Sequence, residues 1–148
     1  LIIDHGSDDG IRYGMPVVTQ QGLVGKIDAV TASASRVQLI NDPASSINVR
    51  MQSLNVEAQL TGTSTGDLEL TMIPADANVQ PGEILLTSGL GGNYPSDILV
   101  GQVLNIQKKE NAIFQTGVVE SQVDFSSLRA VLVITNFSAI DIQSLTNE

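Results

Sequence analysis

The sequence predicts an all-β fold built of small barrels or a sandwich, with little helix. Short apolar stretches with two-residue alternation recur between clusters of Gly, Pro, Asn, Asp and Ser, as is typical of such folds. The chain is 42% hydrophobic but only 3% aromatic, so its core must consist of aliphatic side chains, many of which are β-branched and favour strands. No segment shows a sustained 3.6-residue apolar period, and only residues 43–46 and 126–129 are candidates for single helical turns.

Alternation identifies the individual strands. Within residues 56–61, polar and apolar residues alternate, so one face of the strand is wet and the other dry, as in half-solvated antiparallel sheets. Residues 20–22 and 63–66 are predicted hairpin turns between such segments. The expected strands are residues 1–4, 17–20, 23–30, 36–40, 47–52, 56–61, 68–73, 84–87, 98–108, 116–124 and 130–135.

A domain boundary is predicted near residues 53–56, where the first series of strands ends in Ser-Leu-Asn. This boundary divides the chain into a first small barrel, residues 1–55, and a second, residues 56–137, packed together. The strand within residues 130–137 is a candidate to cross back and complete the first barrel. From residue 138 the composition turns polar, so residues 138–148 are expected to form a flexible tail.

Composition excludes several classes of function. The formal net charge of -9 opposes binding to nucleic acid or to anionic lipid, because both carry negative charge. The chain has 0 Cys, which excludes disulfides, zinc–thiolate sites and thiol nucleophiles. The longest apolar run, residues 130–134, is too short to cross a bilayer, so we expect this piece to be soluble. Because the sequence opens on Leu1 and not on Met, we expect any membrane anchor to lie in flanking sequence.

The chain could alternatively belong to another functional class, the enzymes. It would then be a hydrolase on a protease-like double barrel, with Ser64 or Ser88 as its nucleophile. Residues 62–66 match the G-x-S-x-G pattern, but that pattern works only where a helix follows the serine, and here an alternating strand follows. The chain has 1 His, His5, to serve as general base. A hairpin turn is the favoured interpretation of Ser64.

Cofactor and metal motifs are incomplete. The acidic loop 4–10 has neither EF-hand nor zinc-site spacing, so a solvated turn is expected there. Residues 22–26 resemble the end of a phosphate-binding loop but lack its first Gly and its final Ser or Thr. We therefore expect no cofactor and no metal. The glycines expected to serve structural roles are Gly14, Gly22, Gly25 and Gly101.

The segment 87–95 is the most unusual in the chain, with three glycines and a proline directly after a predicted strand. It lacks the last Gly of G-x-G-x-x-G and no helix follows it, so a sharp connection is expected there and not a nucleotide site. Tyr94 either anchors a protein contact, as tyrosines often do at interfaces, or covers the second barrel as a lid. The candidate interaction loop consists of Thr87, Ser88, Gly89, Leu90, Gly91, Gly92, Tyr94 and Pro95.

Several motifs, taken in order, resemble the MreC family of rod shape-determining proteins. These are GSDDG at 6–10, GMPVV at 14–18, GLVGK at 22–26, SRVQLINDP at 35–43, TSGLGGNYP at 87–95 and VGQV at 100–103. The resemblance covers about residues 3–135. One departure is Ser96-Asp97, where the family usually has Pro-Gly or similar, which affects the shape of that turn.

The resemblance implies two six-stranded β-barrels with chymotrypsin-like topology and no catalytic residues. It also implies a non-enzymatic extracytoplasmic scaffold of the cell-elongation complex, which organises peptidoglycan synthesis and maintains cell shape. Expected partners are a class B penicillin-binding transpeptidase, MreD and RodA, with self-association into dimers or filaments. Anchoring would be through a missing N-terminal transmembrane helix that precedes a coiled coil. A periplasmic adaptor-type binding module is the remaining alternative.

Overall fold

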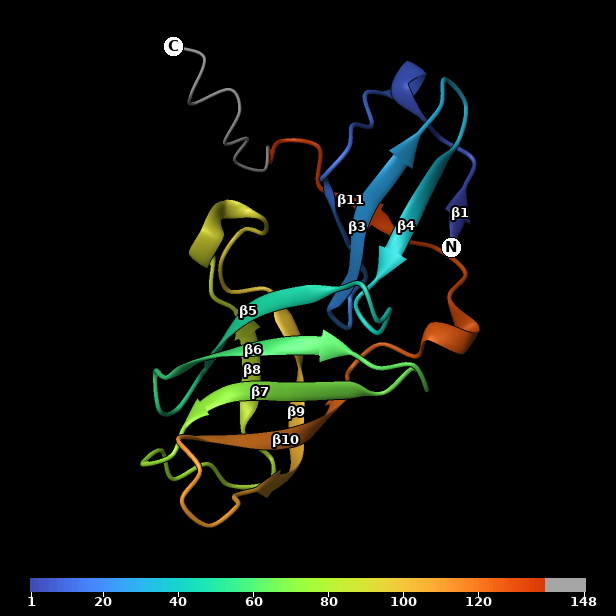
Figure 1. Cartoon of the computed structure of the whole chain (residues 1–148). Helices are drawn as coiled ribbons and strands as arrows, with labels where there is room; N and C mark the ends of the chain where they lie inside the picture. Colours follow the sequence, from blue (N-terminus) through green and yellow to red (C-terminus); the bar gives the residue numbers. More distant parts are fainter. Residues whose placement is uncertain (138–148) are drawn as a thin grey trace.

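The computed structural model of the chain describes residues 1–137 and is all-β (Figure 1). Its only helices in this range are three single 3-10 turns, at Ser7–Asp9, Leu90–Gly92 and Phe125–Ser127. The predicted fold class, all-β with little helix, is confirmed. The tail expected at residues 138–148 lies outside the described residues. In residues 1–137 no helix has the length and apolarity needed to cross a bilayer.

Six strands form a closed antiparallel barrel, which occupies the lower half of Figure 1. Its order is β10-β7-β6-β5-β8-β9, so every strand has two neighbours and no edge is left open. The predicted hairpin at 63–66 is confirmed between β6 and β7, with Gly66 N donating to Thr63 O at 3.0 Å. The barrel strands are β5 (Ser46–Met51), β6 (Glu57–Gly62), β7 (Leu68–Pro74), β8 (Ile84–Thr87), β9 (Leu99–Gln107) and β10 (Phe114–Ser121).

The apolar side chains of the alternating strands point into this barrel, as the sequence pattern predicts. In β6, Ala58 and Leu60 are buried while Glu57 is exposed, and in β7, Leu68 and Leu70 are buried while Glu69 is exposed. Aliphatic side chains from all six strands meet in one core, as the low aromatic content requires.

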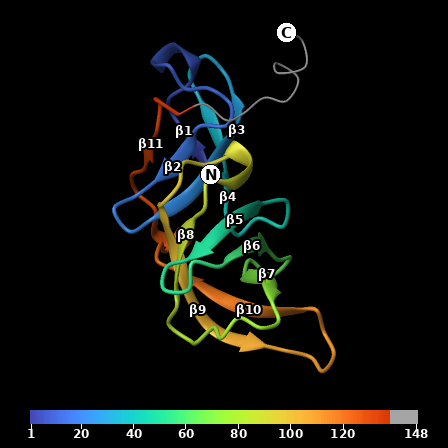
Figure 2. The ribbon, with the colours of Figure 1, turned by 90° about the vertical axis from the view of Figure 1, so that its left-hand side faces the viewer.

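The other strands form a second, open sheet, which lies above the barrel in Figure 1 and again in the turned view of Figure 2. Its order is β1-β4-β3-β2-β11, with every neighbouring pair antiparallel. The predicted hairpin at 20–22 is confirmed, with Thr19 N donating to Gly22 O at 2.9 Å. The strands are β1 (Ile2–Ile3), β2 (Pro16–Val18), β3 (Leu23–Val30), β4 (Ser35–Leu39) and β11 (Leu132–Val133).

The structure differs from the sequence-based division of the chain at two points. β5 was expected in the first unit, 1–55, but it pairs with β6 and β8 in the closed barrel. The first sheet has five strands in the described residues and is open, where a six-stranded barrel was expected. Alternation shows which side of a strand is buried but not against which sheet, so it could not place β5. β11 returns from the C-terminal end of the described chain to pair with β2.

The two sheets share a tight boundary. Leu23 of β3 and Ile40 are fully buried within the core of the closed barrel, and Phe125 packs against both core clusters. At Gly22 an added Cβ would lie 2.6 Å from the carbonyl oxygen of Leu99, so the turn before β3 presses directly on β9. The open sheet and the barrel therefore pack directly against each other.

Candidate interaction surfaces

The Gly-rich loop that follows β8 is closed at its base by one buried side chain. Thr87 Oγ1 donates to the carbonyl of Pro95 at 2.6 Å and accepts from Ile98 N at 2.9 Å, while Thr87 O accepts from Asp97 N at 2.8 Å. Thr87 is 0% exposed, so these bonds form away from water, where an unpaired hydroxyl would be costly. The two ends of the loop are thereby held together.

The top of the loop depends on glycine. Gly91 has φ +83, a region that side chains with a Cβ rarely adopt, and Gly89 and Gly92 have φ +76 and +73. Asn48 Nδ2 donates to Leu90 O at 3.2 Å and ties the loop to β5. The side chain of Leu90 is left 61% exposed.

Tyr94 lies inside the barrel. Its side chain is 6% exposed and belongs to the barrel's core cluster, and burial raises the pKa of its phenol above the ordinary value. Of the two roles expected for Tyr94, packing as a lid matches this position, because a ring this deeply buried offers a partner almost no surface. Leu90 is the loop residue that presents apolar surface instead.

The departure from the family pattern at Ser96-Asp97 has a local explanation. Asp97 has φ +69, a left-handed conformation that Asp tolerates better than most residues. Its carboxylate pairs with Arg50 of β5, with Nη2 and Oδ1 2.5 Å apart. Because the Asp97 side chain is 64% exposed, the pair orients the loop more than it stabilises the fold.

Three of the four glycines expected to be structural lie where two backbones nearly touch. An added Cβ at Gly25 would lie 1.9 Å from the carbonyl oxygen of Gln38 in the neighbouring strand, and one at Gly101 would lie 2.3 Å from that of Glu120. Gly22 has the contact with β9 described above. Gly14 stands in a turn with φ +86.

An exposed apolar surface covers part of the outer face of the barrel, on β7, β9 and β10. Along β10, Phe114 and Val118 are exposed while Gln115, Gly117 and Val119 are buried. We call the surface the outer patch. It consists of Met72 (52% exposed), Leu104 (46%), Ile113 (79%), Phe114 (45%) and Val118 (37%).

Two irregularities in the strands build the outer patch. The register of β9 against β10 shifts between Val118, opposite Asn105, and Val119, opposite Val103, which leaves Leu104 as an extra residue beside Val118. The register of β7 shifts in the same way near Met72, which has φ +60. Alternation alone predicts neither bulge, so sequence analysis missed this surface.

The two serines considered as nucleophiles, Ser64 and Ser88, lack the neighbouring base that a serine hydrolase needs. Ser64 lies in the turn between β6 and β7, with a strand and not a helix after it, and Ser88 Oγ accepts from Leu90 N at 3.0 Å. The imidazole of His5 pairs with Asp9 and Asp4 and not with either serine. No nucleophile–base pair is therefore assembled at Ser64 or Ser88 within residues 1–137.

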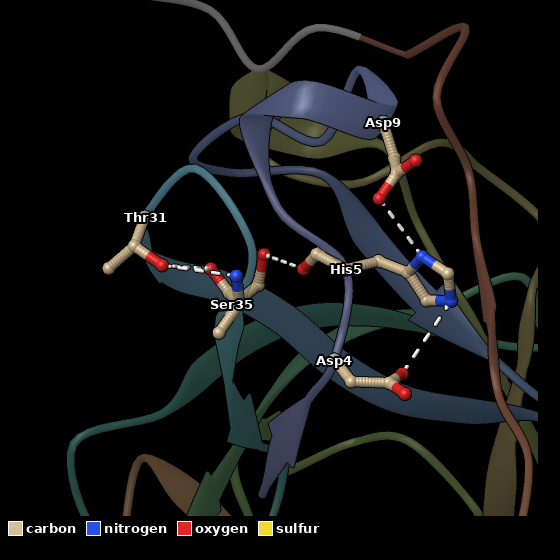
Figure 3. A network of polar contacts seen from close by, with 6 residues as sticks. Asp4, His5, Asp9, Thr31 and Ser35 are labelled. Atoms are coloured by element: carbon tan, nitrogen blue, oxygen red, sulfur yellow. Dashed lines mark hydrogen bonds and ion pairs between the residues drawn. The ribbon is translucent and has the colours of Figure 1, made fainter.

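His5 takes part in a different network (Figure 3). Its Nδ1 donates to Asp9 Oδ2 at 3.0 Å, its Nε2 lies 3.6 Å from Asp4 Oδ1, and its carbonyl accepts from Ser35 Oγ at 2.7 Å. The hydrogen bond with Asp9, followed by the charge of Asp4, raises the pKa of His5 above its ordinary value. Within residues 1–137 no group of three or more acidic, His or Cys side chains has a geometry suited to a metal ion.

Comparison with known proteins identifies the family of this chain. The family model "Rod shape-determining protein MreC, barrel core" matches residues 1–135. The chain belongs to the MreC family. The curated MreC of Cereibacter sphaeroides, a cell shape-determining protein, is 40% identical over 103 residues, which are 70% of this chain and 34% of that protein. The chain spans 29%, 43% and 46% of the MreC proteins of Escherichia coli, Haemophilus influenzae and Listeria monocytogenes.

Solved MreC structures share this architecture. The crystal structure of MreC from Pseudomonas aeruginosa superposes with a TM-score of 0.85 at 29% identity, covering 90% of this chain and 86% of that one. The major periplasmic domain of a cell shape-determining MreC filament gives 0.72 at 23%, covering 84% and 78%. A complex between a penicillin-binding protein (PBP2) and MreC from Helicobacter pylori gives 0.67 at 19%, covering 80% and 74%. For the two structures at 23% and 19% identity, the similarity establishes a shared fold and nothing more.

We expect Gly91→Val to lower the free energy of unfolding by about 1–3 kcal/mol, because a β-branched residue is strained at a positive φ. Gly91→Asn is the matched control and should lose less, since Asn enters the left-handed region more readily. Urea denaturation checks both variants. Equal midpoints for Gly91→Val and the wild type would contradict the conformation described for this loop.

Tyr94→Ala should lower stability by about 3–5 kcal/mol, because it removes a buried ring from the barrel core. Tyr13 is 70% exposed. The control Tyr13→Ala should therefore stay within about 0.5 kcal/mol of the wild type. Denaturant melts of the two variants side by side measure the difference. Similar losses from both tyrosines would show that Tyr94 is not a core residue.

Proposed function

We propose that this chain is the extracytoplasmic barrel region of a non-enzymatic scaffold that organises peptidoglycan synthesis in the cell-elongation complex. The observation that carries the proposal is the match of the MreC barrel core to residues 1–135. The periplasmic domain of the related filament protein supports an extracytoplasmic location. Anchoring by a transmembrane helix, self-association, and contacts with MreD and RodA belong to the same proposal, on the strength of the family resemblance.

The partner proposed for this chain is a class B penicillin-binding transpeptidase. The complex of PBP2 with MreC in Helicobacter pylori supports a partner of this kind, since that MreC shares the fold. A scaffold that binds one conformation of the enzyme more tightly than another raises the population of that conformation. The free-energy difference between the two conformations changes by the difference in their binding free energies.

We assign the transpeptidase contact to the outer patch. Its five apolar side chains are between 37% and 79% exposed. Four of them lie on three strands of a closed barrel, and the fifth, Ile113, directly precedes β10. Grouped apolar surface of this kind on a soluble domain commonly marks a binding site. Because β7, β9 and β10 are paired on both sides, the patch is held in shape before binding, which reduces the entropy lost on association.

The Gly-rich loop is the second candidate contact, through Leu90. Its backbone is fixed by Thr87 and Asn48, and Leu90 stands clear of the core with 61% of its surface exposed. A single apolar side chain buries far less area than the outer patch does, so the loop is expected to add a smaller share of the binding free energy.

Leu104→Asp or Val118→Asp should weaken binding of the cognate transpeptidase ectodomain by at least about tenfold, because each places a charge in an apolar contact. Gln20→Asp is the control, since it adds the same charge at an exposed turn of the other sheet. Titration calorimetry measures the affinity, and a urea melt shows that each variant is folded. Wild-type affinity for both patch variants, with a loss on Leu90→Asp, would place the contact on the loop.

We expect no intrinsic hydrolase activity. The reason is that, within residues 1–137, the imidazole of His5 pairs with Asp4 and Asp9 and not with Ser64 or Ser88. Incubation with a broad-spectrum serine-reactive phosphonate, followed by intact-mass spectrometry, tests this directly. Stoichiometric labelling that disappears in Ser64→Ala or Ser88→Ala would overturn the non-enzymatic assignment.

A further inference from the structure

Met72 departs from the alternation of β7. In a regular strand Leu68, Leu70 and Met72 would share one face, because side chains two residues apart point to the same side. Leu68 and Leu70 are indeed buried in the barrel core, but Met72 is 52% exposed. Ile73, which the pattern would turn outward, is buried instead. An apolar side chain that alternation assigns to the core is therefore presented to solvent.

A bulge turns Met72 outward. Between Leu70 and Ile73, β7 has two residues where the paired strand β10 has one, which is the count that defines a β-bulge. Met72 has φ +60, a left-handed conformation that residues other than glycine seldom adopt. Such conformations persist only where the surrounding structure enforces them, and they gather at functional sites. The exposure of Met72 is therefore imposed by the barrel.

The three methionines of the chain differ in their access to solvent. Met15 is 6% exposed and Met51 is 0% exposed, and each belongs to one of the two core clusters, whereas Met72 belongs to neither. A thioether is the group that peroxides oxidise in methionine, and the reagent must reach the sulfur. The chain has 0 Cys that could react in its place. Met72 is thus the sulfur-containing side chain that an oxidant in solution meets first.

We propose that Met72 is an oxidation site, and that its conversion to methionine sulfoxide by hydrogen peroxide weakens binding at the outer patch. The proposal rests on the assignment of the transpeptidase contact to that patch. In the reaction the thioether sulfur attacks one oxygen of the peroxide, so that an S–O bond forms and the O–O bond breaks. The proton on the transferred oxygen passes to the departing hydroxide, which leaves as water. Sulfur loses two electrons and the peroxide gains them.

The product changes the chemistry of the outer patch. Methionine sulfoxide is polar where methionine is apolar. Phe114 of the patch lies opposite Pro74, two residues along β7 from Met72, so the new polar group lies among apolar neighbours. A partner that covers this surface must remove water from the sulfoxide, and an apolar contact gives it no hydrogen bond in return. Affinity therefore falls, while the fold is kept because Met72 lies outside both cores.

The change is reversible and suits the proposed location. Methionine sulfoxide reductases, one for each epimer at sulfur, restore the thioether. Outside the cytoplasm the environment is more oxidising than in the cytosol. Oxidation of Met72 would then reduce the contact between scaffold and transpeptidase under oxidative stress, and reduction would restore it.

Peptide mass spectrometry after timed exposure to hydrogen peroxide tests the site without any partner. In the folded chain Met72 should oxidise at least about tenfold faster than Met15 and Met51, because only its side chain is open to the reagent. In concentrated urea the three rates should converge, which shows that the fold sets the difference. Equal rates at the three positions in the folded chain would overturn the proposal.

Titration calorimetry with the cognate transpeptidase ectodomain tests the consequence. The chain is oxidised alone and the peroxide is removed before mixing, so that methionines of the partner stay reduced. Affinity should fall by at least about fivefold on oxidation and return after treatment with methionine sulfoxide reductases. Peroxide should not change the affinity of Met72→Leu from that variant's own starting value. The matched control Met15→Leu keeps Met72 and should lose affinity on oxidation as the wild type does.

The outcomes separate this inference from the proposed contact. A loss of affinity on oxidation that persists in Met72→Leu would overturn the inference, since the damage would lie at another residue. If oxidation of Met72 leaves the affinity unchanged while Leu104→Asp weakens binding, the oxidation switch is wrong and the contact at the outer patch stands. If Leu104→Asp and Val118→Asp both bind with wild-type affinity, the contact itself is wrong and the regulation proposed for it is wrong as well.

Discussion

The structure depends on the pairing of strands in an even-numbered, all-antiparallel ring. A β-strand at an edge leaves a row of N–H and C=O groups without partners, and closure removes that cost. β5 to β10 close into six strands and leave no edge, whereas the sheet that ends in β1 and β11 stays open within the described residues. Both surfaces proposed to bind the transpeptidase, the outer patch and the Gly-rich loop, belong to the closed unit.

The closed unit supplies rigidity where a scaffold needs it. Its aliphatic core includes Leu23 of β3 and Ile40, which directly follows β4, so the two units cannot separate without exposing buried apolar surface. Thr87 and Arg50 hold the Gly-rich loop against the barrel, and Tyr94 fills the core below it. Because the scaffold is already rigid, little binding free energy is spent on ordering it. More of that free energy can then favour one conformation of the partner over another.

Alternation and turn chemistry predicted most of the fold. The strands, the hairpins at 20–22 and 63–66 and the low helix content all follow from local pattern. The assignment of β5 did not, because Ile47, Val49 and Met51 alternate in the same way whichever sheet they face. The number of strands in the first sheet likewise depends on pairing between distant residues, which a single sequence does not show.

The candidate site was predicted only in part. The Gly-rich segment does form a sharp connection, since three of its glycines have positive φ. The outer patch could not be found from alternation, because Leu104 and Met72 reach the surface through bulges. A partial signal was present in β10, where Phe114 and Val118 lie on the polar side of an alternating strand.

The most direct test of the account is a hydrogen–deuterium exchange footprint of the cognate transpeptidase ectodomain on this chain. The account predicts that binding slows exchange along β9 and β10 around Leu104 and Val118, with a smaller effect near Leu90 and none at the turn 20–22. Protection confined to the open sheet, with β9 and β10 unchanged at saturating partner, would contradict the claim that the outer face of the barrel is the docking surface.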